Sequence, residues 1–199
     1  MKKIFSGVLF LILMAGCIVA DASENNKTLI MEKDNPIVKT TMAVDEIKTF
    51  NFAEKYKMDA AFILVKKSEF KLYAVDSNGN ILATYGCALG KNAGQKEKEG
   101  DMRTPDGIFP IDEILDASSW THDFKDGKGE ISGAYGPWFI SLNTINLSNG
   151  HWGGIGIHGT HAPESVGTQA SEGCIRLNND DIVALKNFAK VGMKVVIEE

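Results

Sequence analysis

The segment "GGIGIHGTHAPESVGTQASEGCIRLNNDD", residues 153–181, holds the features that decide both the fold and the chemistry of this chain. Ile155 and Ile157 alternate with glycines and predict a short buried strand that ends at His158. Cys174 follows 16 residues after that histidine, with polar residues close on both sides. A cysteine that serves only packing is expected among apolar neighbours. The thiol of Cys174 is therefore a candidate for chemistry.

A histidine and a cysteine brought together by a returning loop form a reactive pair. The thiolate is the nucleophilic form of cysteine, and an imidazole both lowers the thiol pKa and returns a proton to a leaving group. Gly159 and Gly173 flank the pair and allow the backbone to approach a substrate closely. The amides of Gly173 and Cys174 could then face a developing oxyanion. The alternative is a structural histidine with an inert or disulfide-bonded cysteine.

The sequence around this segment predicts a mainly β domain with few helices. Short β-rich runs are bounded by glycine and polar residues, and "DSNGN" at 76–80 is typical of a hairpin turn. The expected strands lie in "AAFILVKK" 60–67, "FKLYAV" 70–75, "ILATYGCAL" 81–89, "IFPIDEI" 108–114, "GPWFISL" 136–142 and "KVVIE" 194–198. A long polar loop is expected at 91–107, and a glycine-rich loop between the fourth and fifth of these strands.

One helix is predicted after the cysteine motif. It has Asn178 or Asn179 as N-cap, runs through "DDIVALKNFAK" and stops at Gly192. Its residues Ile182, Leu185 and Phe188 share one face.

The N-terminus predicts export from the cytoplasm. Residues 1–22 combine two lysines, an apolar run too short for a comfortable membrane span, and small residues. Cleavage before Ser23 and lipidation of Cys17 remain alternatives, the second of which would anchor the chain to a membrane surface. Either way the mature chain is extracytoplasmic, in the periplasm or cell envelope. Residues 23–41 are expected to be a polar linker, 42–58 an amphipathic helix and 59–199 one domain.

Charge and cysteine content narrow the possible partners. The net charge is −5, the sequence pI is about 5.4 and no Lys/Arg-rich run occurs, which argues against a nucleic-acid partner. Removal of the signal leaves Cys87 and Cys174. Export would favour a disulfide between them, but we expect both thiols to be free, because Cys87 has the setting of a small core residue.

The motifs "IHGT", "S-x-G-C-I-R" and "N-x-D" together resemble the L,D-transpeptidase catalytic domain of bacterial cell-wall enzymes. The resemblance covers roughly Asp59 to Ile197 and includes the internal "TPDGIFPI" and the final "GMKVVIEE". It implies a β domain of that family acting without a cofactor.

The resemblance also implies roles for individual residues. Cys174 corresponds to the nucleophile, His158 to the general base and the Gly159 carbonyl to the group that orients the imidazole. Ser171 and Gly173 would support the thiol, and Arg176 would bind the substrate. The alternative for Arg176 is a surface ion pair with Asp180.

Glu172 departs from the family pattern, which usually has histidine at this position. If residues 172–174 are extended, the carboxylate faces the same side as the Cys174 sulfur and opposes thiolate formation. An unusual φ at Gly173 would instead turn the carboxylate outward.

The implied reaction is acyl transfer on peptidoglycan stem peptides. Attack by a stem amine makes a cross-link, whereas attack by water makes the enzyme an L,D-carboxypeptidase. Two further alternatives are a zinc-dependent peptidase and a cell-wall-binding module without activity.

Several histidines and aromatic residues bear on these alternatives. Zinc would use His151, His158, His161 and Cys174. His122 is interpreted as a loop histidine. Among the aromatic residues, Trp152 is a candidate for the substrate groove and Trp138 is expected to pack in the core.

Overall fold

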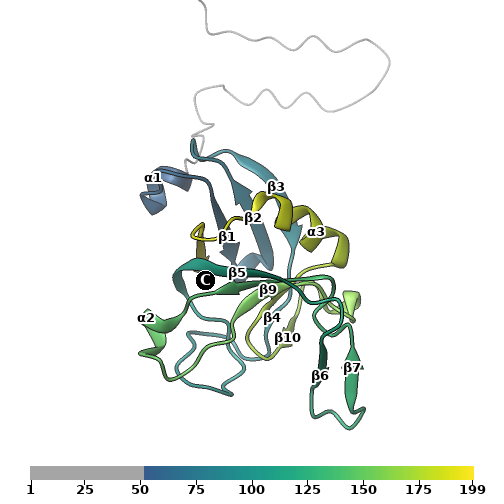
Figure 1. The fold of residues 1–199 in the computed structure, drawn as a ribbon. Coiled ribbons are helices and arrows are strands. Elements are labelled where there is room, and N and C mark those ends of the chain that lie inside the picture. Colours follow the sequence, from purple (N-terminus) through teal and green to yellow (C-terminus); the bar gives the residue numbers. More distant parts are fainter. Residues whose placement is uncertain (1–51) are drawn as a thin grey trace, which may run out of the picture. The chain divides into compact units, whose positions relative to one another are not determined.

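A curled sheet of eight strands organises residues 52–199, the part of the chain that this computed structural model describes (Figure 1). The strands follow one another across the sheet in the order β11 (Ile175–Arg176), β9 (Gly156–His158), β8 (Trp138–Leu142), β5 (Gly107–Asp116), β12 (Lys194–Glu198), β1 (Phe62–Lys66), β2 (Lys71–Val75) and β3 (Ile81–Gly86). The predicted mainly β class is confirmed.

The turn between β2 and β3 forms as the sequence predicts. Asp76 Oδ1 accepts hydrogen bonds from the amides of Asn78 (2.9 Å) and Asn80 (2.8 Å). Gly79 has a φ of 86°, which an L residue rarely adopts. The antiparallel pairing that follows places Tyr73 opposite Thr84.

Strand β5 joins the two halves of the sheet. Its first residues pair antiparallel with β12, with Phe109 opposite Val195, and its later residues pair antiparallel with β8, with Ile114 opposite Ile140. The register shifts between Ile111 and Glu113, where the strand passes from one partner to the other. Such irregularities bend a strand and increase its twist, which curls the sheet.

The strands that carry the motif segment lie at the other edge. In β9 every residue is buried, and Phe139 of β8 lies opposite His158. Strand β11 pairs in parallel with β9, so Arg176 lies opposite His158 on the other side. The predicted strand ending at His158 is therefore confirmed.

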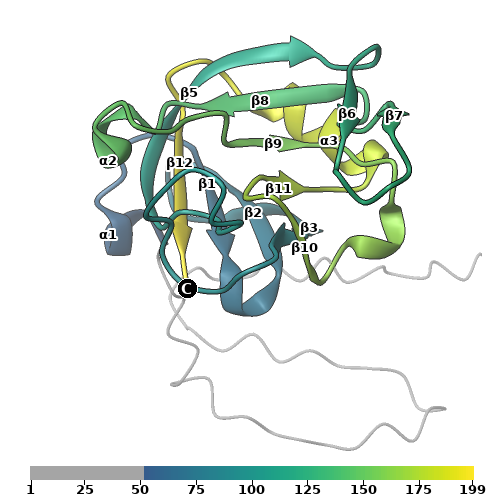
Figure 2. The ribbon, with the colours of Figure 1, turned by 90° about the horizontal axis from the view of Figure 1, so that it is seen from below.

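Two smaller pairings complete the β structure. Strand β4 (Leu89–Gly90) pairs in parallel with β10 (Gln169–Ser171). Strand β6 (Thr121–Asp123) pairs antiparallel with β7 (Glu130–Ser132) in a hairpin that projects from the main sheet (Figures 1 and 2). The sequence predicts only a glycine-rich loop in this region, so the hairpin is a correction to that prediction. Its turn contains positive φ at Lys125, Gly127 and Gly129, which lets the chain reverse and pair.

Helix α3 (Asn179–Phe188) is the predicted helix after the cysteine motif, with Asn178 as N-cap. Ile182 and Leu185 are fully buried, and Phe188 packs against the core, so the predicted apolar face is confirmed. The helix ends before the predicted stop at Gly192, because Ala189 is already extended. Gly192 instead makes the turn into β12 at a φ of 83°.

The remaining helices are short. Helix α1 (Phe52–Tyr56) overlaps the end of the helix predicted at 42–58, and the rest of that prediction lies outside the described residues. Helix α2 (Ile145–Ser148) was not predicted, and single 3₁₀ turns occur at Lys67–Glu69 and Pro163–Ser165. Among residues 52–199, no helix has the length and apolar character needed to cross a membrane.

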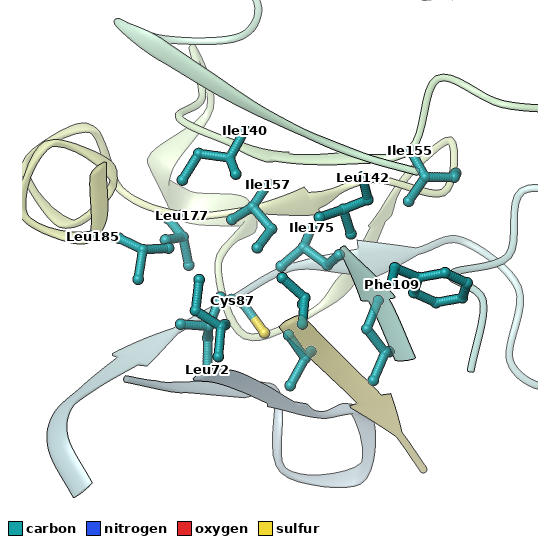
Figure 3. Close-up of a cluster of buried hydrophobic side chains, with 14 of the residues drawn as sticks. Leu72, Cys87, Phe109, Ile140, Leu142, Ile155, Ile157, Ile175, Leu177 and Leu185 are labelled. Carbon is teal, nitrogen blue, oxygen red and sulfur yellow. The ribbon is translucent and has the colours of Figure 1, made fainter. Parts of the chain in front are cut away.

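The core between the sheet and α3 is built from aliphatic side chains (Figure 3). Cys87 lies inside this cluster with no exposed surface, and burial raises the pKa of its thiol to about 12. Its predicted place as a small core residue is confirmed. Trp138 also packs against the cluster, as expected. Cys87 and Cys174 both carry free thiols in the described part of the chain.

Candidate active site

A pocket of about 900 Å³ opens where β8, β9 and the loop before β11 meet the β6–β7 hairpin and the polar loop 91–106. Among the residues predicted from the sequence, it collects His122, Trp152, His158, Ser171, Glu172, Cys174 and Arg176. Lys96 and Tyr135, which were not predicted, line it as well. Residues far apart in the sequence thus share one cavity.

His158 is held in a fixed orientation on β9. Its Nδ1 lies 2.6 Å from the carbonyl oxygen of Gly159, so Nδ1–H donates and the free lone pair is on Nε2. The ring of Phe139 stacks on the imidazole at 5.5 Å with an interplanar angle of 11°. Burial lowers the pKa of His158 to about 3, and the charge of Arg176 acts in the same direction. The imidazole is therefore neutral at physiological pH.

A side chain at the start of α3 holds the turn after His158 in place. Asn179 Oδ1 accepts a hydrogen bond from the Thr160 amide at 2.9 Å. A Cβ at Gly159 would clash with this oxygen and would lie 3.0 Å from the Gly136 Cα. The close approach explains why glycine occupies this position and how the Gly159 carbonyl is kept in place for the imidazole.

Cys174 follows a tight turn between β10 and β11. Ser171 Oγ accepts from the Gly173 amide at 3.0 Å and donates to the Cys174 carbonyl at 2.5 Å. Gly173 has a φ of 137°, and its carbonyl accepts from Thr104 Oγ1 at 2.9 Å. Ser171 and Gly173 thus shape the backbone at the thiol. Because Ser171 occupies the Gly173 amide, the expectation that this amide faces an oxyanion is wrong for this structure.

The Cys174 thiol is protonated in this environment. Desolvation raises its pKa to about 11, and the negative charge of Glu172 acts in the same direction. A hydrogen bond from the Gly156 backbone and the charges of Arg176 and Lys96 oppose the rise. The Sγ atom lies 3.3 Å from the Gly154 carbonyl oxygen, to which the thiol donates.

The parallel pairing of β9 and β11 explains why this thiol and this imidazole share the pocket. Ile175 lies opposite Ile157, so Cys174 is the residue that enters β11 beside the strand carrying His158. Both side chains line the cavity. The arrangement combines a neutral thiol with a neutral, oriented imidazole whose free nitrogen can accept a proton.

Arg176 is a buried cation in the pocket wall. It is 5% exposed and its guanidinium carbon lies 5.1 Å from the centre of the Phe124 ring. Within residues 52–199 its Nε has no hydrogen-bond partner. Among residues 52–199 it forms no salt bridge, so the alternative of a surface ion pair with Asp180 is wrong. A buried guanidinium lining a pocket is suited to an anionic ligand.

Lys96 is a second cation in the pocket, which the sequence analysis did not identify. It is 5% exposed, pairs with Asp101 at 2.7 Å and lies 5.3 Å from the ring centre of Trp152. Trp152 lines the pocket beside this lysine, with 8% of its surface exposed, and also belongs to the hydrophobic core cluster. In the sequence Lys96 lies in the polar loop at 91–107, a pattern that is typical of a solvated surface.

Glu172 makes a contact that the sequence did not predict. Its Oε2 lies 3.0 Å from Nε2 of His122, and the Nδ1 of that histidine lies 3.0 Å from the Tyr135 hydroxyl. The φ of Gly173 breaks the regular alternation that was expected, yet Glu172 and Cys174 still line the same pocket. His122 is therefore a site residue on β6, and its interpretation as a loop histidine is wrong.

The histidines do not gather as metal ligands. Within the described residues, no three His, Cys, Asp or Glu side chains are close enough together to share a metal ion. His161 lies 5.1 Å, ring centre to ring centre, from Phe124, and His151 is exposed after α2. The proposed zinc ligand set of His151, His158, His161 and Cys174 is not assembled.

Comparison with known families identifies the domain. The family model of the L,D-transpeptidase catalytic domain, YkuD, matches residues 60–197. The chain belongs to this L,D-transpeptidase family. The family resemblance stated from the sequence is confirmed, and its span agrees with the extent of the sheet from β1 to β12.

Individual relatives are distant. The chain is 30% identical over 127 residues to "Putative L,D-transpeptidase YkuD" of Bacillus subtilis, and the match covers 64% of this chain and 60% of that protein. It is 31% identical over 138 residues to "Putative L,D-transpeptidase YqjB" of the same organism, covering 69% and 71%. The fold resembles an L,D-transpeptidase from Mycobacterium tuberculosis with a TM-score of 0.51 at 16% identity, covering 70% of this chain and 58% of that one.

Proposed function

We propose that this L,D-transpeptidase family member is a cysteine acyltransferase of peptidoglycan stem peptides, with Cys174 as nucleophile and His158 as general base. The observation that carries the proposal is the shared pocket of a thiol and a buried, neutral imidazole that the Gly159 carbonyl orients. Family membership supplies the reaction class, and the pocket supplies the residues that perform it.

In the first half-reaction, Cys174 attacks the carbonyl carbon between the L-centre of a diamino acid and the following D-residue. His158 Nε2 takes the thiol proton as the sulfur–carbon bond forms. The raised pKa of Cys174 means that this transfer accompanies attack, because no resting thiolate is present. The imidazolium then protonates the departing amine, and a thioester on Cys174 remains.

The negative charge that develops on the oxygen of the attacked carbonyl group requires a hydrogen-bond donor. The Cys174 amide suits this role, since among the hydrogen bonds of residues 52–199 outside the strand ladders it has no acceptor, whereas the Gly173 amide is engaged by Ser171. Ser171 and Gly173 support that amide through the turn they form. Their part in the reaction is thus to position the backbone.

Arg176 suits an acidic group of the donor stem, because it forms no salt bridge in the described chain. Lys96 is already paired with Asp101 at 2.7 Å, where it lies over Trp152 at the pocket wall. A stem peptide carries carboxylates at its terminus and, in many diamino acids, on the side chain. We assign Arg176 to one of these carboxylates, with Trp152 packing against the apolar part of the stem.

Peptidoglycan lies outside the cytoplasm, so the proposed activity requires export. The predicted signal at residues 1–22, the Cys17 alternative and the linker at 23–41 all lie outside the described residues. Export and anchoring therefore remain proposals of the sequence.

Incubation of the purified protein with disaccharide tetrapeptide muropeptides tests the function. Mass spectrometry is expected to show a cross-linked dimer that lacks one terminal D-residue, and Cys174→Ala is expected to give unchanged substrate. A tripeptide as sole product would indicate an L,D-carboxypeptidase. Unchanged muropeptide with wild-type protein, under conditions where the protein is folded, would contradict the proposal.

A further inference from the structure

The pocket holds charged side chains of both signs near Cys174, and the charge of Glu172 also acts on Arg176. Arg176 and Lys96 both lower the thiol pKa, whereas Glu172 raises it, so all three act on the sulfur from within electrostatic range. Each of them lines the same cavity. Arg176, which forms no salt bridge among the described residues, suits a carboxylate of the donor. A carboxylate beside the nucleophile does not serve that donor and opposes the charge on the sulfur during attack.

Glu172 is held in place by the β6–β7 hairpin. Its Oε2 accepts from His122 Nε2–H, while the Tyr135 hydroxyl donates to the other ring nitrogen of that histidine. The ring of Tyr135 in turn contacts the imidazole of His158 edge-on, with 4.9 Å between ring centres. The second carboxylate oxygen, Oε1, forms no hydrogen bond in the described chain and remains available. A positioned carboxylate with one free oxygen is an acceptor for a cation.

We propose that Glu172, positioned by His122, binds the ammonium group of the acceptor in the second half-reaction and so favours an amine over water. This inference rests on the proposed function, because it needs a thioester on Cys174. It makes Glu172 a specificity-determining residue and His122 a positioning residue. The ligand class is a primary ammonium, as on the side chain of a diamino acid.

The step balances if the acceptor loses two protons. The bound ammonium first gives up one proton, and the neutral amine nitrogen then attacks the thioester carbonyl, so that the carbon–nitrogen bond forms and the carbon–sulfur bond breaks. One proton passes through His158 to the departing sulfur and restores the thiol. The other leaves the bound ammonium for the Glu172–His122 pair and passes to water, because these side chains are 35% and 29% exposed. The products are the amide, the free thiol and one released proton.

Removal of the negative charge of Glu172 should change the ratio of cross-linked dimer to tripeptide. Glu172→Gln keeps the size of the side chain and removes only its charge. We expect the ratio of cross-linked dimer to tripeptide to fall about two- to fivefold, the range that one partly exposed ion pair supports. Acylation of Cys174, measured as release of the D-residue in a single turnover, should not slow. Glu99→Gln is the matched control, because Glu99 lines the same pocket without a bond to His122.

Salt supplies a second measurement on the wild-type protein. An ammonium held by a partly exposed carboxylate is screened, so the dimer-to-tripeptide ratio should fall as salt rises, and this slope should be smaller in Glu172→Gln. His122→Asn, which loosens the carboxylate, should lower the ratio as well.

The outcomes separate the inference from the proposed function. An unchanged ratio in Glu172→Gln, an equal fall in Glu99→Gln, or a wild-type ratio that salt does not alter would overturn the acceptor site. A wild-type enzyme that makes only tripeptide would also overturn it, while leaving the chemistry of Cys174 intact. Absence of both products would instead overturn the proposed function.

Discussion

Arg176 lies opposite His158 in the parallel pairing of β9 and β11, and its charge acts with burial to keep the imidazole neutral. One strand pair thus places a substrate-binding candidate beside the base candidate, where its charge adds to the effect of burial on the pKa of that base. A neutral imidazole is the form that can take a proton from the Cys174 thiol.

Replacement of the thiol tests the nucleophile. Cys174→Ser should retain the fold and lower turnover of muropeptides about a thousandfold or more, because a serine hydroxyl is far less acidic than a thiol. Alkylation of the wild-type protein should abolish activity to the same extent, and a metal chelator should leave it unchanged. Loss of activity with EDTA, and its return with zinc, would contradict the cysteine mechanism.

The reactivity of the thiol should depend strongly on pH. With its pKa raised to about 11, Cys174 should react slowly with iodoacetamide at neutral pH and faster as the pH rises. Glu172→Gln removes a charge that raises this pKa, so the midpoint of the alkylation profile should move to lower pH, and the shift should shrink with added salt. Glu164→Gln, at an exposed turn, is the control. Equal midpoints in the wild type and Glu172→Gln at low salt would refute the effect.

Because His158 is buried in its neutral form, the free energy of unfolding should decrease as the pH is lowered. The folded pKa of about 3 lies below the unfolded value of 6.5, so between these values only the unfolded chain binds the proton. This contribution is present above pH 6.5 and is lost as the pH falls toward 3, at up to about 1.36 kcal/mol per pH unit. Denaturant unfolding should show a shallower loss in His158→Gln. Exposed His151→Gln should follow the wild type, and identical slopes for all three proteins would exclude this origin.

Substitution of Gly159 tests whether its carbonyl group positions the His158 imidazole. Gly159→Ala places a methyl group against the Asn179 side chain and should cost about 1–3 kcal/mol of unfolding free energy. It should also lower kcat, because it moves the carbonyl that orients the imidazole. Gly153→Ala is a matched control, since a Cβ there meets nothing within 4 Å. Equal stability of the two variants would show that the turn adapts without cost.

The sequence predicts the parts of this site that depend on local signals. Alternation along Ile155 and Ile157 identifies β9, and the setting of Cys174 distinguishes it from a packing cysteine such as Cys87. The apolar face of α3 follows from helical spacing. These features are decided within a few residues, where periodicity and turn chemistry act.

The contacts of Glu172 could not be predicted in this way. His122 lies 50 residues before Glu172, on a hairpin whose strands are only three residues long and show no clear alternation. Lys96 has the neighbours of a solvated loop, and only the fold places it against Trp152. Such contacts come from tertiary structure, which no local pattern in one sequence specifies.

Strand β12 lies in the middle of the sheet, between β5 and β1. Before Lys194–Glu198 has been synthesised, the chain lacks strand β12. This strand joins the β1–β2 hairpin to β5 and, through β5, to the strands that carry His158 and Arg176. The centre of the sheet can therefore close only after Lys194–Glu198 has been synthesised and has paired with both β5 and β1.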